Sequence, residues 1–412
     1  MLGKSGALPY ISGMQDVVII GSGLVGSAMA IALARGGLRV ALIDAASQNA
    51  RLESAYDGRT AAIAYGSRCV LEALEVWPDI AHAEPIDDIR VCDQDTGAYV
   101  HYHYKDAGEE PFGHIIENRH LRQALYGQLA RYDAITLHAP AKVTAVNNDG
   151  ALAQVTLDNG TQLKAPLLLV ADGKMSATRD MLGIKANISE YGQTAIVCTI
   201  AHSAPHHGLA VERFLPAGPF ALLPMSEQRT NIVWTERDAV AQRMLQLDET
   251  ALLQEIRKRA GEHLGELSLA GPRFAYPLKL IRAERSIAPR AALIGDAAHA
   301  IHPIAGQGVN LGYRDVAAIA ELILARARLG LDIGADALLN DYARWRRFDV
   351  ASMAAATHGL NLLFSNDILP LRLLRDAGLN GVNQVMPLKQ FFMRHAMGMV
   401  GDLPTLMQKE AS

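Results

Sequence analysis

Residues 16–44 read DVVIIGSGLVGSAMAIALARGGLRVALID, and this stretch decides the fold. The apolar run Val17–Ile20 is typical of a buried parallel strand, and a Gly-rich turn and a helical pattern to Arg35 follow it. A second strand, Arg39–Ile43, then ends on Asp44. The segment therefore predicts a strand–helix–strand unit with G-x-G-x-x-G in the place where dinucleotide-binding folds carry it.

Each glycine of this turn has its own predicted role. Gly21 makes the tight turn, Gly23 admits a pyrophosphate against the backbone, and Gly26 lets the helix pack closely on the strand. Asp44 lies 21 residues beyond Gly23, where a carboxylate binds a ribose diol. An acid there favours an adenosine with a free 2′-hydroxyl, and so FAD or NAD over NADP.

Length and composition narrow the class of protein. A chain of 412 residues is long enough for two or three domains, and 50% apolar residues with 35 glycines suit an α/β protein. The net charge of −4 provides no overall field for nucleic acid. The three cysteines are far apart without metal-ligand spacing, so we expect buried reduced thiols in a cytoplasmic protein.

The sequence predicts neither a signal peptide nor a membrane span. The first 13 residues have too short an apolar run for a signal peptide. Residues 17–34 carry no charge, but their glycines are spaced as a nucleotide-binding turn. We expect a soluble protein that is attached, at most, to the inner face of the cytoplasmic membrane.

A second motif, VADGKMSATR at residues 170–179, places an acid directly after an apolar strand. Asp172 is positioned to cap the turn, and Arg179 to hold it by an ion pair. Asp-Gly turns are also common as purely structural features, so both interpretations stay open here.

A third motif, LIGDAAHAIHPIAGQGVNLGYRD at residues 293–315, begins as a strand and ends in a long Ala-rich helix. Asp296 lies at the strand end, where its carboxylate can accept hydrogen bonds from a polyol. Gly306 and Gly308 allow the backbone to approach a flat ring, and the helix start offers free N–H groups. On its own this stretch fits an ordinary strand, turn and helix equally well.

The segments between the motifs predict two further sheets. Residues 89–104 alternate as strands, residues 191–235 alternate as strands of a larger sheet, and a helix runs from Asp248 to about Arg259. Residues 135–163 predict a small antiparallel meander with a hairpin turn at Asn159-Gly160.

The tail, from His358 to about Gly401, is apolar at helical steps and carries mostly basic charges. This pattern fits helices packed on the core, and it also fits a surface for a membrane, a lipid substrate or a partner.

The three motifs in this order resemble the group A FAD-dependent aromatic monooxygenases, the para-hydroxybenzoate hydroxylase-like superfamily, over essentially the whole chain. The stretches YDGR (56–59), IENR (116–119) and ERF (212–214) make the chain similar, more narrowly, to the ubiquinone-biosynthesis FAD-dependent hydroxylases, the UbiH/UbiF group. Within that group it most resembles the UbiH-like branch, the 2-polyprenyl-6-methoxyphenol hydroxylases, which act at C1 of the prenylated ring.

The resemblance implies an α/β fold with an α+β substrate domain. A Rossmann-like FAD-binding domain of the para-hydroxybenzoate hydroxylase type would carry an inserted antiparallel-sheet substrate domain and C-terminal helices. The implied boundaries are 14–88, 109–190 and 276–345 for the FAD-binding domain, 89–108 and 191–275 for the substrate domain, and 346–412 for the C-terminal helical region.

The resemblance also implies that FAD is the cofactor. Gly21, Gly23 and Gly26 would hold its pyrophosphate and Asp44 its adenosine ribose, although the family usually has Glu at this last position. The other implied contacts are Arg59 beside the flavin, Asn118 or Arg119 at the ribityl chain, Asp172 in the second motif, Asp296 at the ribityl and pyrophosphate region, and Pro303, Gly306, Gly308 and Asn310 in the loop that faces the isoalloxazine.

The implied reaction is hydroxylation of the ring of a polyprenylated phenol in ubiquinone biosynthesis, through a flavin C4a-hydroperoxide formed with O₂. The chain has no second G-x-G-x-x-G, so the electron donor, NAD(P)H or another reductant, stays open. No metal is expected and no catalytic side chain is assigned. His299 and His302 lie in the third motif without a role.

The pocket for the ring should be mainly apolar. We expect its sheet wall to contain Phe214, Phe220, Leu222 and Trp234. We expect this pocket to bind the phenol and O₂, and we expect no nucleic-acid partner. Whether the protein contacts a ubiquinone-biosynthesis complex or a membrane, and whether it forms oligomers, stays open.

Two alternative functions remain at this stage. One is a flavin-dependent reductase of a prenyl substrate on the same scaffold. The other is a non-catalytic FAD-binding scaffold of a biosynthetic complex, against which the glycines argue, because a scaffold needs no close backbone access to the ring.

Overall fold

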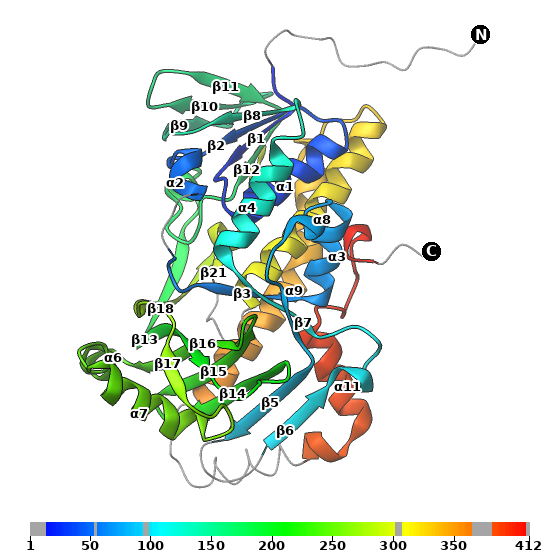
Figure 1. The fold of residues 1–412 in the computed structure, drawn as a ribbon. Helices are drawn as coiled ribbons and strands as arrows, with labels where there is room; N and C mark the ends of the chain where they lie inside the picture. Colours follow the sequence, from blue (N-terminus) through cyan, green and yellow to red (C-terminus); the bar gives the residue numbers. More distant parts are fainter. Residues whose placement is uncertain (1–13, 53–55, 94–98, 301–306, 365–380, 409–412) are drawn as a thin grey trace.

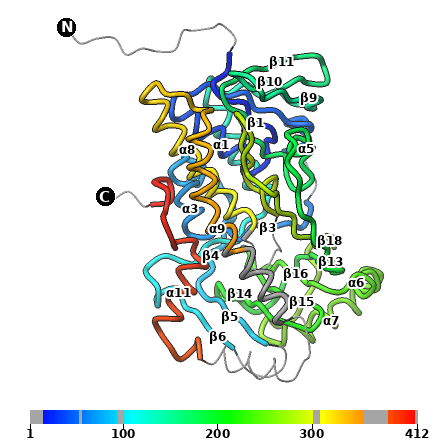
Figure 2. The backbone as a smooth tube through the Cα atoms, turned by 180° about the vertical axis from the view of Figure 1, so that it is seen from behind, coloured from blue at the N-terminus to red at the C-terminus, as the bar shows by residue number. Residues whose placement is uncertain are grey.

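The computed structural model describes residues 14–52, 56–93, 99–300, 307–364 and 381–408 (Figure 1). One half of the molecule is built on a six-stranded sheet and the other half on a nine-stranded sheet. Long helices near the C-terminus run along both halves (Figures 1 and 2).

The six-stranded sheet carries all three motifs. In spatial order its strands are β19 (Ile287–Ala288), β20 (Ala291–Leu293), β12 (Leu167–Val170), β1 (Val17–Ile20), β2 (Val40–Ile43) and β8 (Ile135–His138). All neighbours are parallel except β19 and β20. Each motif strand ends at the same edge, so the turns that follow β1, β12 and β20 meet there.

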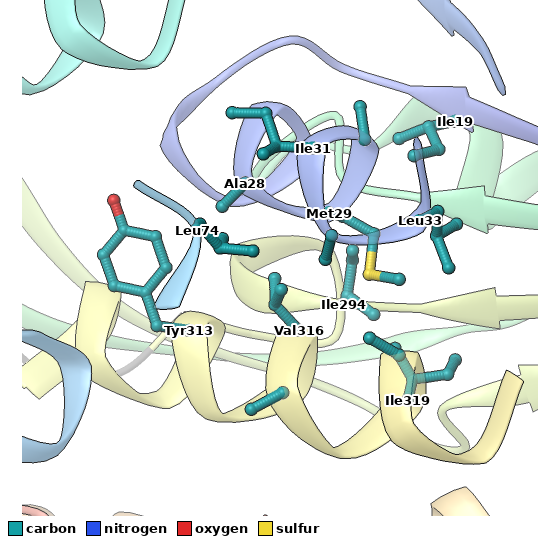
Figure 3. Close-up of a cluster of buried hydrophobic side chains, with 14 of the residues drawn as sticks. Ile19, Ala28, Met29, Ile31, Leu33, Leu74, Ile294, Tyr313, Val316 and Ile319 are labelled. Atoms are coloured by element: carbon teal, nitrogen blue, oxygen red, sulfur yellow. The ribbon is translucent and has the colours of Figure 1, made fainter. Parts of the chain in front are cut away.

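Both faces of this sheet are covered, which explains why its central strands are apolar at every position. Val17 and Ile19 of β1 face the helices α1 (Leu24–Arg35), α4 (Asn118–Leu129) and α8 (Gln307–Arg328). Figure 3 shows Met29 on α1 and Val316 on α8 in one layer. The other face packs against the meander β9 (Val143–Asn147), β10 (Ala153–Leu157) and β11 (Gln162–Ala165).

The structure corrects the predicted extent of the meander. Residues 135–138 form β8, which pairs in parallel with β2 and extends the large sheet. The hairpin turn at Asn159-Gly160 is present, with Gly160 at φ +83° and the Asn159 side chain accepting a hydrogen bond from Thr161 N. The partner strand β2 is about a hundred residues away in the sequence, so the local pattern of residues 135–138 could not predict this pairing.

The nine-stranded sheet is built from segments far apart in the sequence. In spatial order its strands are β21 (His299–Ala300), β18 (Phe274–Ala283), β13 (Ala186–His202), β16 (Arg229–Arg237), β15 (Gly218–Met225), β14 (Leu209–Leu215), β5 (Asp88–Asp93) and β6 (Tyr99–His103), with β17 (Leu267–Leu269) paired to β13. The helices α6 (Asp238–Leu245) and α7 (Glu249–Ala260) cover its outer face. Because β21 follows Asp296 directly, the third motif joins the two sheets.

A three-stranded sheet of β3 (Thr60–Ala64), β7 (Gly113–Glu117) and β4 (Glu84–Ile86) lies between the two halves. The pattern of residues 56–66 predicts only the approach to a helix, and β3 precedes that helix, α3 (Tyr65–Ala73). The remaining elements are α2 (Gln48–Leu52), η1 (Trp77–Asp79), η2 (Tyr104–Asp106), α5 (Ala177–Met181), η3 (Gly295–Ala297), α9 (Asp336–Phe364), α11 (Met386–Ala396) and η5 (Thr405–Met407).

The tail is helical where the structure describes it. In α11, Met393 is buried, whereas Phe391 and Phe392 are 50% and 43% exposed. The helix is tied to the nine-stranded sheet by an ion pair of 3.0 Å between Lys389 and Asp106. Much of the apolar pattern before α11 lies outside the described side chains. Among the described helices, none has the length and apolar character needed to cross a membrane.

A buried ionic cluster fixes the third motif against the two long helices. The Asp315 carboxylate on α8 accepts hydrogen bonds from Gly295 N at 2.8 Å, His299 Nε2 at 2.8 Å and Arg346 Nε of α9 at 2.7 Å. Asp315 is fully buried, and burial acts to raise its pKa, but His299 and Arg346 outweigh burial and hold the pKa below its usual range. One carboxylate therefore joins the loop after β20 to α8 and α9.

We predict that Asp315→Ala destabilises the fold, because the buried Gly295 N–H and His299 lose their acceptor and Arg346 is left paired with Asp349. The expected loss of unfolding free energy is about 3–5 kcal/mol in urea denaturation at pH 7. Asp341→Ala is the matched control, because it removes a surface pair with Arg344 on the same helix and should cost under about 1 kcal/mol. Equal losses in the two variants would contradict the role given to Asp315.

Candidate functional site

A cleft of about 500 Å³ opens where the three motif turns meet. Gly23 after β1, Lys174 after β12 and Asp296 after β20 all line it. The opposite wall is the inner face of β13, β16 and β18, with apolar residues such as Val197 and Val233. The cleft thus joins a polar floor on one sheet to a largely apolar wall on the other.

The three glycines of the first turn differ in how much space surrounds the position where a Cβ atom would lie. Gly21 has φ +102°, and a Cβ there would lie 2.4 Å from Ala171 O. At Gly26 a Cβ would lie 1.8 Å from Gly21 O, so this glycine permits the close contact of α1 with the turn. Apart from its chain neighbours, no described residue has an atom within 4 Å of the Cβ position at Gly23, which faces the cleft. Protein packing therefore explains two glycines, and the open space at the third fits a ligand.

Asp44 lies behind the wall of the cleft. It is buried and accepts hydrogen bonds from Ser22 N and Ser22 Oγ, both at 2.7 Å, and from Arg51 Nη2 at 2.8 Å. Burial acts to raise the pKa of Asp44, but the hydrogen bonds from Ser22 and Arg51 outweigh it and lower the pKa. Arg51, rather than Asp44, lines the cleft.

Three guanidinium groups, those of Arg51, Arg59 and Arg122, line one part of the cleft. Arg59 is paired with Asp57 at 2.6 Å. The pKa of Arg122 is lowered, chiefly by burial and further by Arg59 and Arg51, while Asp57 opposes the shift. This mutual repulsion favours an anionic ligand such as a pyrophosphate. Sequence reasoning missed Arg51 and Arg122; the only available signal was that Arg122 follows Asn118 by one helical turn.

Of the two residues predicted at the start of α4, the structure places only one in the cleft. Asn118 lines it. Arg119 instead pairs with Glu117 at 2.6 Å, and its guanidinium lies 5.5 Å from the centre of the Tyr56 ring. Neighbouring positions on a helix point about 100° apart, so the two side chains do not share a surface.

The second motif supports the site from behind. Asp172 accepts a hydrogen bond from Thr178 N at 3.3 Å and does not line the cleft, so the structure favours its capping role. Arg179 is buried and donates to Ala297 O at 3.3 Å, beside Asp296. Its ion pair is with Asp180 at 3.4 Å, and it also donates to Lys174 O at 3.2 Å, so it holds the turn through the carbonyls of Lys174 and Ala297.

Asp296 presents its carboxylate to the cleft. The surrounding protein raises its pKa, while His299 and Lys174 act to lower it. None of the described residues donates a hydrogen bond to this carboxylate. Its acceptor capacity is therefore available to a ligand with hydroxyl groups.

The rest of the third motif divides between the cleft and the core. Gly308 lines the cleft, and outside its own helix no described residue has an atom within 4 Å of its Cβ position. Asn310 turns away; its side chain accepts from Ala64 N at 2.9 Å and donates to Ala62 O at 2.8 Å, which ties α8 to β3. His299 is buried against Asp315 and does not line the cleft. His302, Pro303 and Gly306 lie outside the described residues.

None of the four residues predicted for the pocket wall lines the cleft. Phe220, Leu222 and Trp234 lie on the outer face of the nine-stranded sheet, in the core beneath α7. Arg259 of α7 stacks on Trp234 at 4.0 Å. Phe214 belongs to the inner face but does not line the cleft. Alternation identifies two faces of a strand, but it does not reveal which face the helices cover.

The inner face that forms the wall carries the neighbours of the predicted residues. Val233 lies beside Trp234 in β16, and Asn231, Val197 and Ala195 share its face. Asn231 is buried and donates to Gly58 O at 3.0 Å, so the wall is tied to the segment that carries Arg59.

The histidine pair on β6 lies away from the cleft. His101 and His103 both contact Asp88 Oδ1, at 2.7 and 3.1 Å. Across the described ranges, no group of three or more His, Cys, Asp or Glu side chains is arranged to hold a metal ion.

Comparison with known proteins gives the same family along nearly the whole chain. The model of the FAD binding domain family matches residues 14–357. The chain is 47% identical over 386 residues to the ubiquinone hydroxylase UbiL of Rhodospirillum rubrum, covering 93% of this chain and 90% of that protein. It is 31% identical to the 3-demethoxyubiquinol 3-hydroxylase of Escherichia coli, covering 93% and 98% of the two chains.

The fold is also found in solved structures. The crystal structure of p-nitrophenol 4-monooxygenase PnpA from Pseudomonas putida matches with a TM-score of 0.77 at 17% identity, covering 93% of this chain and 98% of that one. The predicted α/β fold class, of the para-hydroxybenzoate hydroxylase type, is confirmed.

We predict opposite effects for two glycine substitutions in the first turn. Gly26→Ala should destabilise the FAD-free protein, because its methyl group would lie 1.8 Å from Gly21 O. Gly23→Ala should leave the FAD-free protein as stable as the wild type, since the methyl group enters open space, but should weaken FAD binding at least tenfold.

The measurements are urea denaturation of the protein stripped of FAD, and FAD titration followed by flavin fluorescence. Each variant is the control for the other. Unchanged FAD affinity in Gly23→Ala would show that the open space at this glycine does not serve the cofactor.

Proposed function

Since the chain belongs to the FAD-dependent hydroxylases of ubiquinone biosynthesis, we propose that its cleft holds FAD beside the ring of a polyprenylated phenol. The chain is an FAD-dependent monooxygenase. The observation that carries the site assignment is the unsatisfied carboxylate of Asp296, which shares one cleft with Gly23 and three guanidinium groups.

The residues present fit the cofactor. The open space at Gly23 and the charges of Arg51 and Arg122 suit the pyrophosphate. Asp296 and Asn118 suit the hydroxyl groups of the ribityl chain. Gly308 leaves the backbone open to a planar ring.

The role of Asp44 changes in this proposal. Its oxygens already accept hydrogen bonds from Ser22, Ala46 and Arg51. We propose that Asp44 reaches the adenosine ribose once Arg51 turns toward the pyrophosphate, and that until then it holds the first turn through Ser22.

FAD, when reduced by NAD(P)H, supplies the oxygen-activating chemistry of the reaction. The protein orients the substrate ring and keeps water away from it. Val197 and Val233 form an apolar wall that suits a prenylated ring. Asp296 acts through cofactor binding.

The same geometry supports a division of the chain into domains. We propose FAD-binding segments at 14–88, 109–190 and 276–345, substrate segments at 89–108 and 191–275, and a C-terminal helical region at 346–412. The parallel pairing of β5 with β14 supports the assignment of residues 89–108 to the substrate domain.

The test is one turnover. The protein is reduced with NADPH without oxygen, and air is then admitted with a short-chain prenylphenol. A product heavier by one oxygen atom is expected, and NMR of that product gives the ring position, for which C1 stays our prediction. Reduced prenyl chains would instead support a reductase, and a flavin that NADPH never reduces would support a scaffold.

Asp296→Ala should purify colourless, because the hydroxyl groups of the cofactor lose their carboxylate acceptor. Asp180→Ala, an exposed carboxylate on α5, is the matched control and should purify yellow. FAD content is read from absorbance at 450 nm as a ratio to protein. A fully yellow Asp296→Ala protein would contradict the assignment.

We also propose that α11 contacts a membrane surface. Its exposed apolar residues are Met386, Leu388, Phe391 and Phe392, with Val385 just before the helix. Phe391 and Phe392 pack edge to face, and the exposed Arg394 lies one turn further along. An apolar surface with a basic border suits an anionic bilayer from which a prenylated substrate would come.

We predict that replacing Phe391 and Phe392 together by Ser reduces sedimentation with anionic liposomes several-fold. The fold should remain intact, because Met393 and Met397 carry the buried contacts of the helix. Exchange of Met175 and Met181, exposed on the other half of the molecule, for Ser is the control. Liposome binding that both double variants retain equally would contradict the role of α11.

A further inference from the structure

The inner face of the nine-stranded sheet continues beyond the cleft as a row of side chains across the strands. The pairing register places Val197, Val233, Ala221, Glu212 and Val91 side by side on β13, β16, β15, β14 and β5. Glu212 is the one charged residue in this row. It lies two strands from Val233 of the cleft wall, about 10 Å at the usual strand spacing.

Glu212 faces the interior of the molecule. Its neighbours along β14 on the same face are Ala210 and Phe214, both buried. The adjacent strand β15 contacts α9, β4 and β7, so this part of the sheet is covered. Glu212 itself is only half-buried, which leaves part of its side chain open within this apolar setting.

The structure provides no partner for this carboxyl group. No hydrogen bond or ion pair joins Glu212 to any described residue, unlike the buried Glu117 of β7, which pairs with Arg119 and Arg229. Burial raises the pKa of Glu212 to about 7, and no charged neighbour contributes to the shift. An unpaired acid of this kind costs stability, so a purely structural role does not explain it.

We propose that Glu212 binds the hydroxyl group of the substrate ring through a hydrogen bond to its carboxylate. The inference rests on the proposed function, because it places the phenol along the apolar row that begins at Val233. An apolar row with a single acceptor suits a ligand that is hydrophobic apart from one phenolic hydroxyl. An ionised acceptor also increases the electron density of the ring, which favours electrophilic hydroxylation.

Few other titratable groups share this face among the described residues. They include Asp93 on β5, beside Phe214, and Tyr102 on β6, whose pKa is raised to about 12 by burial. Arg229 on β16, which pairs with Glu117 of β7, and Tyr276 on β18 are on the same face. The fully buried Asp93 has a partner of its own. A change in ligand binding near pH 7 therefore points to Glu212.

The test compares Glu212→Gln and Glu212→Leu with Glu236→Gln in the FAD-loaded protein. Glu236 is the matched control, a buried glutamate on the outer face of β16 in the same sheet. The ligands are a short-chain prenylphenol and its O-methyl ether, which lacks the hydroxyl proton. Their dissociation constants are measured from the flavin absorbance change at pH 6 and pH 8.

We expect wild-type protein and Glu236→Gln to bind the phenol more tightly at pH 8 than at pH 6. Both Glu212 variants should bind it about ten- to a hundredfold more weakly at pH 8 and lose this pH dependence. The methyl ether should bind all four proteins alike. Unaltered FAD content shows that the variants fold.

Three outcomes would overturn the inference, and they differ in what else they contradict. If both Glu212 variants bind the phenol with the wild-type affinity and pH profile, this inference is overturned and the proposed function is unaffected. Wild-type protein that binds neither phenol nor ether overturns the proposed function, and the inference with it. Equal weakening for phenol and ether would assign Glu212 a role in the shape of the pocket and would also overturn it.

Discussion

The site depends on the fully buried carboxylate of Asp315. It accepts hydrogen bonds from the turn after β20, from His299 and from Arg346, and so three segments meet at one charge. If this charge were unpaired, its burial would be very unfavourable, so the three donors must be in place together. Asp296 is held one residue beyond the bound Gly295 N–H. The cluster thereby fixes the backbone that presents Asp296 to the cleft and gives His299 a structural role.

The glycines near the cleft are of two kinds: some are required by protein packing, and others leave space for a ligand. Gly21, Gly26 and Gly312 are required by protein atoms that a Cβ would strike, including Val25 opposite Gly312. Gly23 and Gly308 face open space in the cleft. A sequence motif contains both kinds without distinguishing them. Only the packing shows that two of these glycines have no explanation within the protein itself.

Features that depend on neighbouring residues could be predicted from the sequence, and features that depend on distant partners could not. The strand–helix–strand unit, the three motif turns and the strands β13 to β16 follow from short patterns, because each depends on neighbouring residues. The parallel pairing of β8 and the strand β3 depend on distant partners. The face of Trp234 was misjudged because α6 and α7 decide which side of the sheet is covered. Arg51 and Arg122 belong to no motif and reach the cleft only through the packing of α2 and α4.

Four carboxylates in the two halves of the molecule fall into two classes. Asp44 and Asp315 are filled with hydrogen bonds from the protein, and their pKa values are lowered despite burial. Asp296 and Glu212 have no hydrogen-bond donor among the described residues, and burial raises the pKa of each. The first class uses its acceptor capacity to position the turns. The second class retains that capacity: Asp296 is exposed to the cleft and Glu212 is half-buried, so a ligand that supplies hydroxyl groups would find a free acceptor at each. In the proposals made above, the cofactor hydroxyls would contact Asp296 and the ring hydroxyl would contact Glu212.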